Sequence, residues 1–200
     1  MFKSYRIGTI WGFPIEINLS LLFLIAAAVL FMDGLSALLI IPILFVSVLL
    51  HELGHAVVAR HLGVSIAGIE LGFLGGAAKM TSQPKTANHE ALIAAAGPLV
   101  SFALAGIGLS VGALTDSSFI YMIGLVNGIL GAFNLIPALP MDGVRILRAL
   151  LTRRYDFVRA TEISVTVARG VAIAFGIVGL ILPQIFLIIL APFLWLMSSA

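Results

Sequence analysis

The chain has 200 residues, of which 61% are hydrophobic and 10% are charged. In soluble domains about a quarter of all residues are charged. This composition therefore excludes an ordinary soluble domain and indicates a membrane protein. The sequence contains no cysteine, which excludes disulfides, thiolate metal sites and a cysteine nucleophile. The formal net charge of +2 is small, and the dispersed cations are better explained as topology signals than as a nucleic-acid-binding surface.

Six apolar runs predict an all-α polytopic membrane protein with six transmembrane helices, formed by a single integral domain over 1–200. The expected spans lie approximately at 19–32, 36–60, 89–114, 118–139, 163–182 and 184–197. The first 18 residues lack the pattern of a signal peptide, so the first span is expected to be retained. Segment 63–83 has several glycines among β-branched residues, which predicts a short β-hairpin or a re-entrant loop after the second span.

The charges between the runs predict the orientation of the chain. All eleven lysines and arginines fall on one side of a six-span arrangement, while Asp33 and Asp116 lie in connections on the other side. Cytoplasmic connections are enriched in lysine and arginine. Both termini and the basic segment 143–160 are therefore expected in the cytoplasm, and the protein is expected to be a multi-pass protein of the cell membrane.

Glycines in the third and fourth runs are expected to let neighbouring helices approach closely, as small residues do in membranes. They are Gly97, Gly106, Gly108, Gly112, Gly124, Gly128 and Gly131. The sequence gives these positions a role in helix association and none in ligand binding.

The sequence His51-Glu52-Leu53-Gly54-His55 lies inside the second apolar run. Residues four apart share one face of a helix, so both imidazoles reach the same ion, and Glu52 lies beside it. The residue frequencies of this chain give a chance match a probability of about 0.002. Ionisable groups are also costly within a span unless they line a functional site. The motif therefore predicts a metal site with an adjacent base.

A catalytic zinc ion takes three protein ligands, so a third ligand is sought outside this motif. Asp142 follows Pro137 and Pro140 at the broken end of the fourth run and precedes a glycine. An aspartate here is equally suited to cap a helix that begins near Gly143, and the residues alone leave both interpretations open. Interfacial or solvated positions better explain the remaining candidates, which are His61, His89, Glu70 and Glu90.

The motif at 51–55, the tripeptide Ala96-Gly97-Pro98 and the stretch from Asn134 to Arg145 together resemble the site-2 protease family of intramembrane zinc metalloproteases. Segment 12–17, the pair Gly75-Gly76 and the plan of six spans are similar to that family as well. Since no PDZ insertion separates these motifs, the chain looks most like the compact members from archaea and bacteria.

The resemblance implies one Zn²⁺ ion held by His51, His55 and Asp142, with Glu52 as the general acid and base. It also implies that Asn134 lies near the substrate peptide, although an interhelical hydrogen bond is the ordinary role of asparagine in membranes. The glycine-rich segment with Gly75 and Gly76 is expected to bind an unwound substrate by β-augmentation. Alternatively, this segment packs over the site as a plug.

The expected function is hydrolysis of peptide bonds within transmembrane segments of other proteins, with zinc-activated water as the nucleophile. His51 is about 14 residues into its span, which places it about 10 Å from the cytoplasmic edge of a 30 Å hydrocarbon core. The active site is therefore expected toward the cytoplasmic side. The expected partners are transmembrane substrates and the lipid bilayer, with no nucleic acid.

A metal-ion transporter or sensor that uses the same His/His/Asp site is the main alternative. A transport site needs ligands but no dedicated base such as Glu52, and a transporter would show polar residues along a path through the far leaflet. The first and third runs and the outer half of the second have almost none. A catalytically silent membrane chaperone is a third alternative, disfavoured because the proposed catalytic residues are all present.

Overall fold

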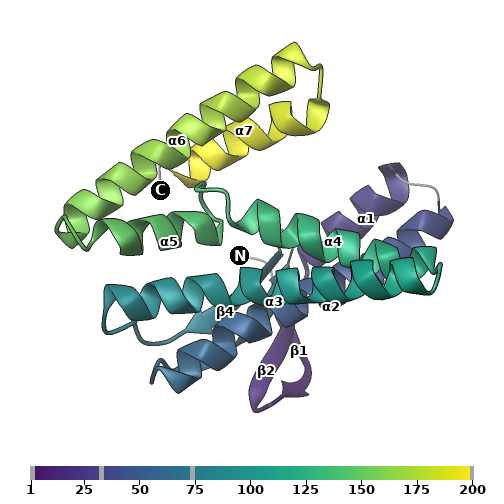
Figure 1. The fold of residues 1–200 in the computed structure, drawn as a ribbon, viewed down its shortest axis with the longest axis horizontal. Coiled ribbons are helices and arrows are strands. Elements are labelled where there is room, and N and C mark those ends of the chain that lie inside the picture. Colours follow the sequence, from purple (N-terminus) through teal and green to yellow (C-terminus); the bar gives the residue numbers. More distant parts are fainter. Residues whose placement is uncertain (1–2, 32–33, 73–74, 199–200) are drawn as a thin grey trace. The chain divides into compact units, whose positions relative to one another are not determined.

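The computed structural model describes residues 3–31, 34–72 and 75–198 (Figure 1). Within them the chain forms seven helices and four strands. In chain order these are β1 (Ser4–Ile10), β2 (Phe13–Asn18), α1 (Leu21–Phe31), α2 (Gly34–His61), β3 (Ile66–Gly72), β4 (Gly75–Met80), α3 (Ala87–Leu114), α4 (Ser118–Asn134), α5 (Asp142–Leu151), α6 (Phe157–Ile181) and α7 (Ile185–Met197). Asp33, one of the two acidic residues expected on the non-cytoplasmic side, lies outside the described residues.

Apolar helices dominate the chain, as the sequence predicts. Three of them are long and apolar enough to cross a membrane, namely Leu38–His61 within α2, α3 and α6. Two others, α4 and α7, are apolar but shorter. The fourth predicted run ends earlier than expected, because α4 stops at Asn134 rather than near 139. A separate short helix, α5, follows within the basic segment, close to the position near Gly143 where a helix was considered. A crossing by all six predicted spans stays a prediction.

The chain divides into two compact units. The first unit contains Met1–Pro84 and Ala96–Gly131, and the second contains Lys85–Ala95 and Ala132–Ala200. The first unit therefore holds the sheet, α2 and most of α3 and α4, while the second holds α5, α6 and α7.

The first unit contains a four-stranded sheet in the order β1-β2-β3-β4. Strands β1 and β2 form one antiparallel hairpin, and β3 and β4 form another. The two hairpins join through parallel pairing of β2 with β3, with Ile15 opposite Ile69. The hairpin predicted within 63–83 is confirmed. The N-terminal hairpin was not predicted, so the fold is mostly helical with a small sheet rather than all-α.

The sheet packs against α2 through a single apolar core. Its buried side chains are Phe13, Ile15, Leu53, Ala56, Ile69 and Leu71. Alternation along β2 and β3 sends every second side chain into this core, while Leu53 and Ala56 come from the segment of α2 that carries the His51–His55 motif. The core therefore holds the sheet beside that motif.

Three charged residues connect β2, β3 and β4. Lys79 Nζ lies 2.8 Å from Glu16 Oε2 and 2.6 Å from Glu70 Oε2. Ser4 and Asn18 donate hydrogen bonds to the other oxygen of Glu70. The ammonium of Lys79 and these donors lower the pKa of Glu70 from an ordinary value of 4.5 to about 2. Glu70 is thus a partner in the sheet and not the freely solvated residue that the sequence suggested.

This depressed pKa makes the contribution of Glu70 to stability dependent on pH. The contribution is complete above the unfolded pKa near 4.5 and is lost as the pH falls toward the folded pKa of about 2. We expect Glu70→Gln to lower Tm at pH 7 by about 2–4 °C, the shift for about 1 kcal/mol in a chain of this size. The deficit should shrink in thermal scans below pH 4. An equal deficit at pH 3 and pH 7 would contradict this account.

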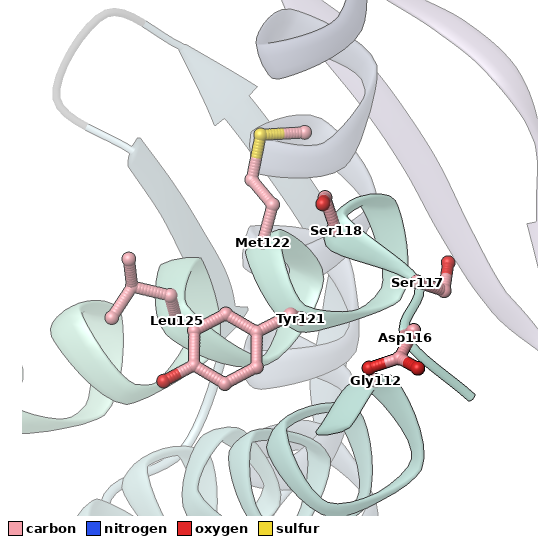
Figure 2. Close-up of a pocket in the computed structure, with 7 residues that line it drawn as sticks. All are labelled: Gly112, Asp116, Ser117, Ser118, Tyr121, Met122 and Leu125. Atoms are coloured by element: carbon pink, nitrogen blue, oxygen red, sulfur yellow. The ribbon is translucent and has the colours of Figure 1, made fainter. Parts of the chain in front are cut away.

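Glycines bring α3 and α4 into close contact within the first unit. A Cβ on Gly108 would lie 2.6 Å from Gly124 Cα, and one on Gly112 would lie 2.5 Å from Tyr121 N. The predicted role of small residues is confirmed at these positions, whereas the space beside Gly106 is open. A pocket of about 320 Å³ lies at the α3–α4 turn. Figure 2 shows the residues that line it, which are Gly112, Asp116, Ser117, Ser118, Tyr121, Met122 and Leu125.

In the second unit, α6 and α7 lie side by side (Figure 1). Buried residues of α6, α7 and the α4–α5 connection form its core, namely Ala138, Met141, Ala172 and Leu194. Arg148 of α5 forms an ion pair with Glu90 and also lies over the ring of Phe157, 5.2 Å from its centre. Glu90 is only 8% exposed, so the expectation that it is solvated is wrong.

Candidate metal centre

One turn of α2 brings three potential metal ligands together. His51, Glu52 and His55 each offer one ligand atom within 4.8 Å of the other two. Their side chains are buried, with exposures of 3%, 9% and 3%. The two imidazole rings meet edge to face, with centres 4.8 Å apart. The spacing of four residues thus places both histidines on one helix face, with the carboxylate beside them.

Gly97 of α3 faces this cluster at very short range. A Cβ built on Gly97 would lie 2.2 Å from His55 Nε2 and 2.5 Å from His51 Nε2. Both Nε2 atoms therefore converge on one small space that is open only because residue 97 has no side chain. Two converging imidazole nitrogens and a nearby carboxylate are a donor set that Zn²⁺ accepts. The residues present fit the metal that the motif predicts.

Ser101 fixes the orientation of one of these imidazoles. Its hydroxyl oxygen lies 2.9 Å from His51 Nδ1, and its side chain is fully buried, one helical turn beyond Gly97. When His51 carries its proton on Nδ1, it donates to Ser101 Oγ and presents the lone pair of Nε2 to an ion. Ser101 therefore acts as a positioning residue for His51.

Replacing Ser101 by alanine should weaken metal binding, because the imidazole loses the partner that fixes its proton and its angle. Outer partners of this kind contribute about 10- to 100-fold to metal affinity. Competition with a chromophoric zinc chelator measures this change independently of any enzymatic assay. Ser110→Ala is the matched control, since Ser110 is an exposed serine on the same helix. An affinity unchanged in Ser101→Ala would refute the positioning role.

Strand β4 covers the carboxylate of Glu52. The backbone N–H of Ala78 donates a hydrogen bond to Glu52 Oε2 at 3.0 Å. A Cβ on Gly76 would lie 2.3 Å from Glu52 Cγ, so only glycine permits this approach. Gly75 adopts a φ of +104°, a conformation that favours glycine. The two glycines predicted from the sequence thus shape the strand that orients Glu52.

The other predicted residues, Asp142 and Asn134, belong to the second unit. Asp142 is 8% exposed and is the first residue of α5. Met141 occupies the N-cap position, so the interpretation of Asp142 as the helix cap is wrong. A Cβ on Gly143 would lie 2.2 Å from the carbonyl oxygen of Leu135. This close approach, rather than a tight turn, explains the glycine after Asp142.

Of the predicted site residues, the structure brings His51, Glu52, His55 and Gly76 together within the first unit. Sequence reasoning missed two further contributors. Gly97 was assigned to helix association and noted within the tripeptide Ala96-Gly97-Pro98, with no contact to the metal site expected, and Ser101 was not singled out. Their spacing of four residues on one helix was an available signal, because it places a glycine and a buried polar side chain on the same face.

Comparisons with known proteins point to one protein family. The family model described as Peptidase family M50 matches residues 39–117 and 113–177. The chain is 41% identical over 204 residues to "Zinc metalloprotease MJ0392" of Methanocaldococcus jannaschii, which covers 96% of this chain and 58% of that protein. It is 39% identical over 149 residues to Rip3 of Mycobacterium tuberculosis, which covers 68% of this chain and 37% of Rip3. The chain thus spans little more than half the length of the first relative.

The fold agrees with the same family. The solved structure titled "Site-2 Protease from Methanocaldococcus jannaschii" superposes with a TM-score of 0.76 at 36% sequence identity. The match covers 98% of this chain and 94% of that one. Sequence, fold and the buried His51–Glu52–His55 cluster therefore agree, and the chain belongs to Peptidase family M50, the site-2 protease family of zinc metalloproteases.

Proposed function

We propose that this protein is an intramembrane zinc metalloprotease that hydrolyses peptide bonds within transmembrane segments of other membrane proteins. The observation that carries the proposal is the buried His51–Glu52–His55 cluster within a helix long and apolar enough to cross a membrane. Ionisable groups in such a helix are costly and mark functional sites. Membership of a zinc metalloprotease family supports hydrolysis as that function.

In the proposed mechanism, His51 and His55 hold the ion through Nε2, with Asp142 as the third ligand. The resemblance of the stretch 134–145 to the family and the burial of the Asp142 carboxylate support this choice. A Zn²⁺ ion bound there would act as a Lewis acid toward the scissile carbonyl and would lower the pKa of a water molecule. Glu52 accepts the proton of the attacking water and then delivers it to the leaving amine. The Ala78 N–H holds the Glu52 carboxylate in place for both transfers.

Substrate binding is assigned to β4 and to Asn134. A helix must unwind before its peptide bonds can be reached, which frees backbone groups that need partners within the membrane. Strand β4 is at the edge of the sheet and lies beside Glu52, so the segment with Gly75 and Gly76 can pair with the unwound peptide. The side-chain amide of Asn134 is proposed to donate a hydrogen bond to a carbonyl oxygen of the substrate.

The membrane arrangement is part of the same proposal. The whole chain forms one integral domain that crosses the cell membrane six times, with both termini and basic segment 143–160 in the cytoplasm. Segregation of all eleven cations to one side supports this topology. The active site then lies toward the cytoplasmic side, and the partners are transmembrane substrates and the surrounding lipid.

The proposal is tested with purified protein in liposomes that contain single-span test proteins. We expect cleavage in the presence of zinc, its loss after treatment with a chelator, and its return when zinc is restored. The metal-transport alternative is tested in the same liposomes with a trapped fluorescent zinc indicator. Entry of zinc without cleavage of any test protein, or cleavage that persists in the chelator, would overturn the proposal.

A further inference from the structure

An apolar pocket lies one helical turn away from the metal-site histidines. It has a volume of about 260 Å³ and is formed within the first unit by α2, α3 and α4. Its apolar lining comes from Pro42, Ile43, Val46, Leu50, Leu104 and Ile123. Sites for drug-sized ligands measure about 300–1,000 Å³, so this smaller pocket suits one or two apolar side chains.

Two polar residues, Ser47 and Asn127, complete the lining. Asn127 Nδ2 donates to Ser47 Oγ and to the carbonyl oxygen of Ile123, each at 2.9 Å. These bonds use both amide hydrogens. Asn127 Oδ1 has no hydrogen-bond partner among the described residues, although the side chain is only 1% exposed. Leaving a buried acceptor unpartnered is unfavourable, and a ligand with a hydrogen-bond donor would remove that cost.

Possible partners of Asn127 Oδ1 differ in whether they offer a free hydrogen-bond donor. Lipid acyl chains offer none, and the backbone N–H groups of an intact helix are already bonded within it. An unwound peptide segment presents free N–H groups together with apolar side chains, which match the acceptor and the lining of the pocket. Such a segment is the substrate of the proposed reaction.

We infer that this pocket, with Asn127 as its acceptor, is a specificity subsite for an apolar side chain of the substrate. The inference rests on the proposed function. Ser47 precedes His51 by four residues, or about 6 Å along α2. An extended peptide advances about 3.3 Å per residue, so the pocket receives the side chain about two residues from the scissile bond. Asn127 Oδ1 accepts a backbone N–H of the same stretch.

A photocrosslink tests the placement without turnover. A benzophenone amino acid is introduced at Val46, which lines the pocket and is 51% exposed, in the Glu52→Gln background. We expect crosslinks to the test protein within about two residues of the mapped scissile bond. The control position is Ile129, which is 61% exposed and outside the pocket. Crosslinks from Val46 to lipid alone, or the same substrate residues reached from Ile129, would overturn the inference.

Specificity gives an independent readout. Val46→Phe narrows the pocket, so kcat/KM should fall about tenfold for a substrate with leucine or phenylalanine at the crosslinked position and stay within about twofold for one with alanine there. Asn127→Leu should raise KM about tenfold for both substrates and leave zinc affinity unchanged. If Val46→Phe lowers kcat/KM equally for both substrates, Val46 has only a structural role and the pocket does not select the substrate side chain. If the parent cleaves nothing, the proposed function fails; if it cleaves and these patterns are absent, only the subsite fails.

Discussion

Glu52→Gln is expected to reduce peptide hydrolysis by about 10²- to 10⁴-fold, the contribution of a positioned general acid and base. The amide of glutamine has nearly the same shape as the carboxylate, and its oxygen can still accept the hydrogen bond that Ala78 donates to Glu52. It cannot accept the proton of the attacking water. The variant should therefore fold and bind zinc normally while losing activity. Initial cleavage rates and zinc content per mole of purified protein measure the two properties separately.

Glu162→Gln is the matched control for this experiment, because Glu162 is exposed on α6 and forms an ion pair with Arg159. It should cleave at the parental rate. If Glu52→Gln cleaves as fast as the parent, Glu52 has no part in proton transfer. If instead the variant loses its zinc, Glu52 acts as a ligand rather than as the base.

Gly97→Ala is expected to have the second large effect. The added methyl group would lie 2.2 Å and 2.5 Å from the Nε2 atoms of His55 and His51, so at least one imidazole must turn away. Mutation of a residue that only orients a metal ligand lowers metal affinity by about 10- to 100-fold. Because Gly97→Ala displaces a ligand itself, we expect zinc affinity to fall about 100-fold or more, and the cleavage rate to fall with it. Zinc affinity is again measured by competition with a chelator.

The same helix supplies a matched control for Gly97→Ala. A Cβ on Gly106 meets no atom within 4 Å, so Gly106→Ala should bind zinc and cleave like the parent. This control separates a general effect of alanine in the helix from the specific contact at residue 97. Parental zinc affinity in Gly97→Ala would mean that the imidazoles do not converge as described.

The part of the site that the sequence predicts well is the local part. His51, Glu52 and His55 lie within one turn and a half of α2, so helix geometry alone fixes their relative positions. Gly97 and Ser101 reach the same cluster from α3, some 46 and 50 residues after His51. No periodicity in the sequence specifies which face of one helix packs against which face of another. The contacts of Gly97 and Ser101 with the histidines could therefore be found only from the structure.

In the sheet, too, the sequence predicts local pairing but not long-range pairing. The hairpin of β3 and β4 was predicted from its glycines and β-branched residues, which are local signals. Strand β2 pairs with β3 in parallel only after the intervening helices α1 and α2. Trp11 and Gly12 form the turn between β1 and β2, and both have a positive φ. Gly12 was the local sign of this hairpin in the sequence, and it was overlooked. Its pairing with β3 depends on burial against α2, which sequence patterns do not report.

Peptide hydrolysis is expected to take place within a membrane-spanning segment of the substrate. The most direct measurement is the mass of the products from a single-span test protein cleaved in liposomes by the zinc-loaded parent. We expect a cut between two residues of the apolar segment, nearer its cytoplasmic end, and no such products with Glu52→Gln. A cut confined to the water-exposed flanks, or an intact test protein beside a fully zinc-loaded enzyme, would contradict it.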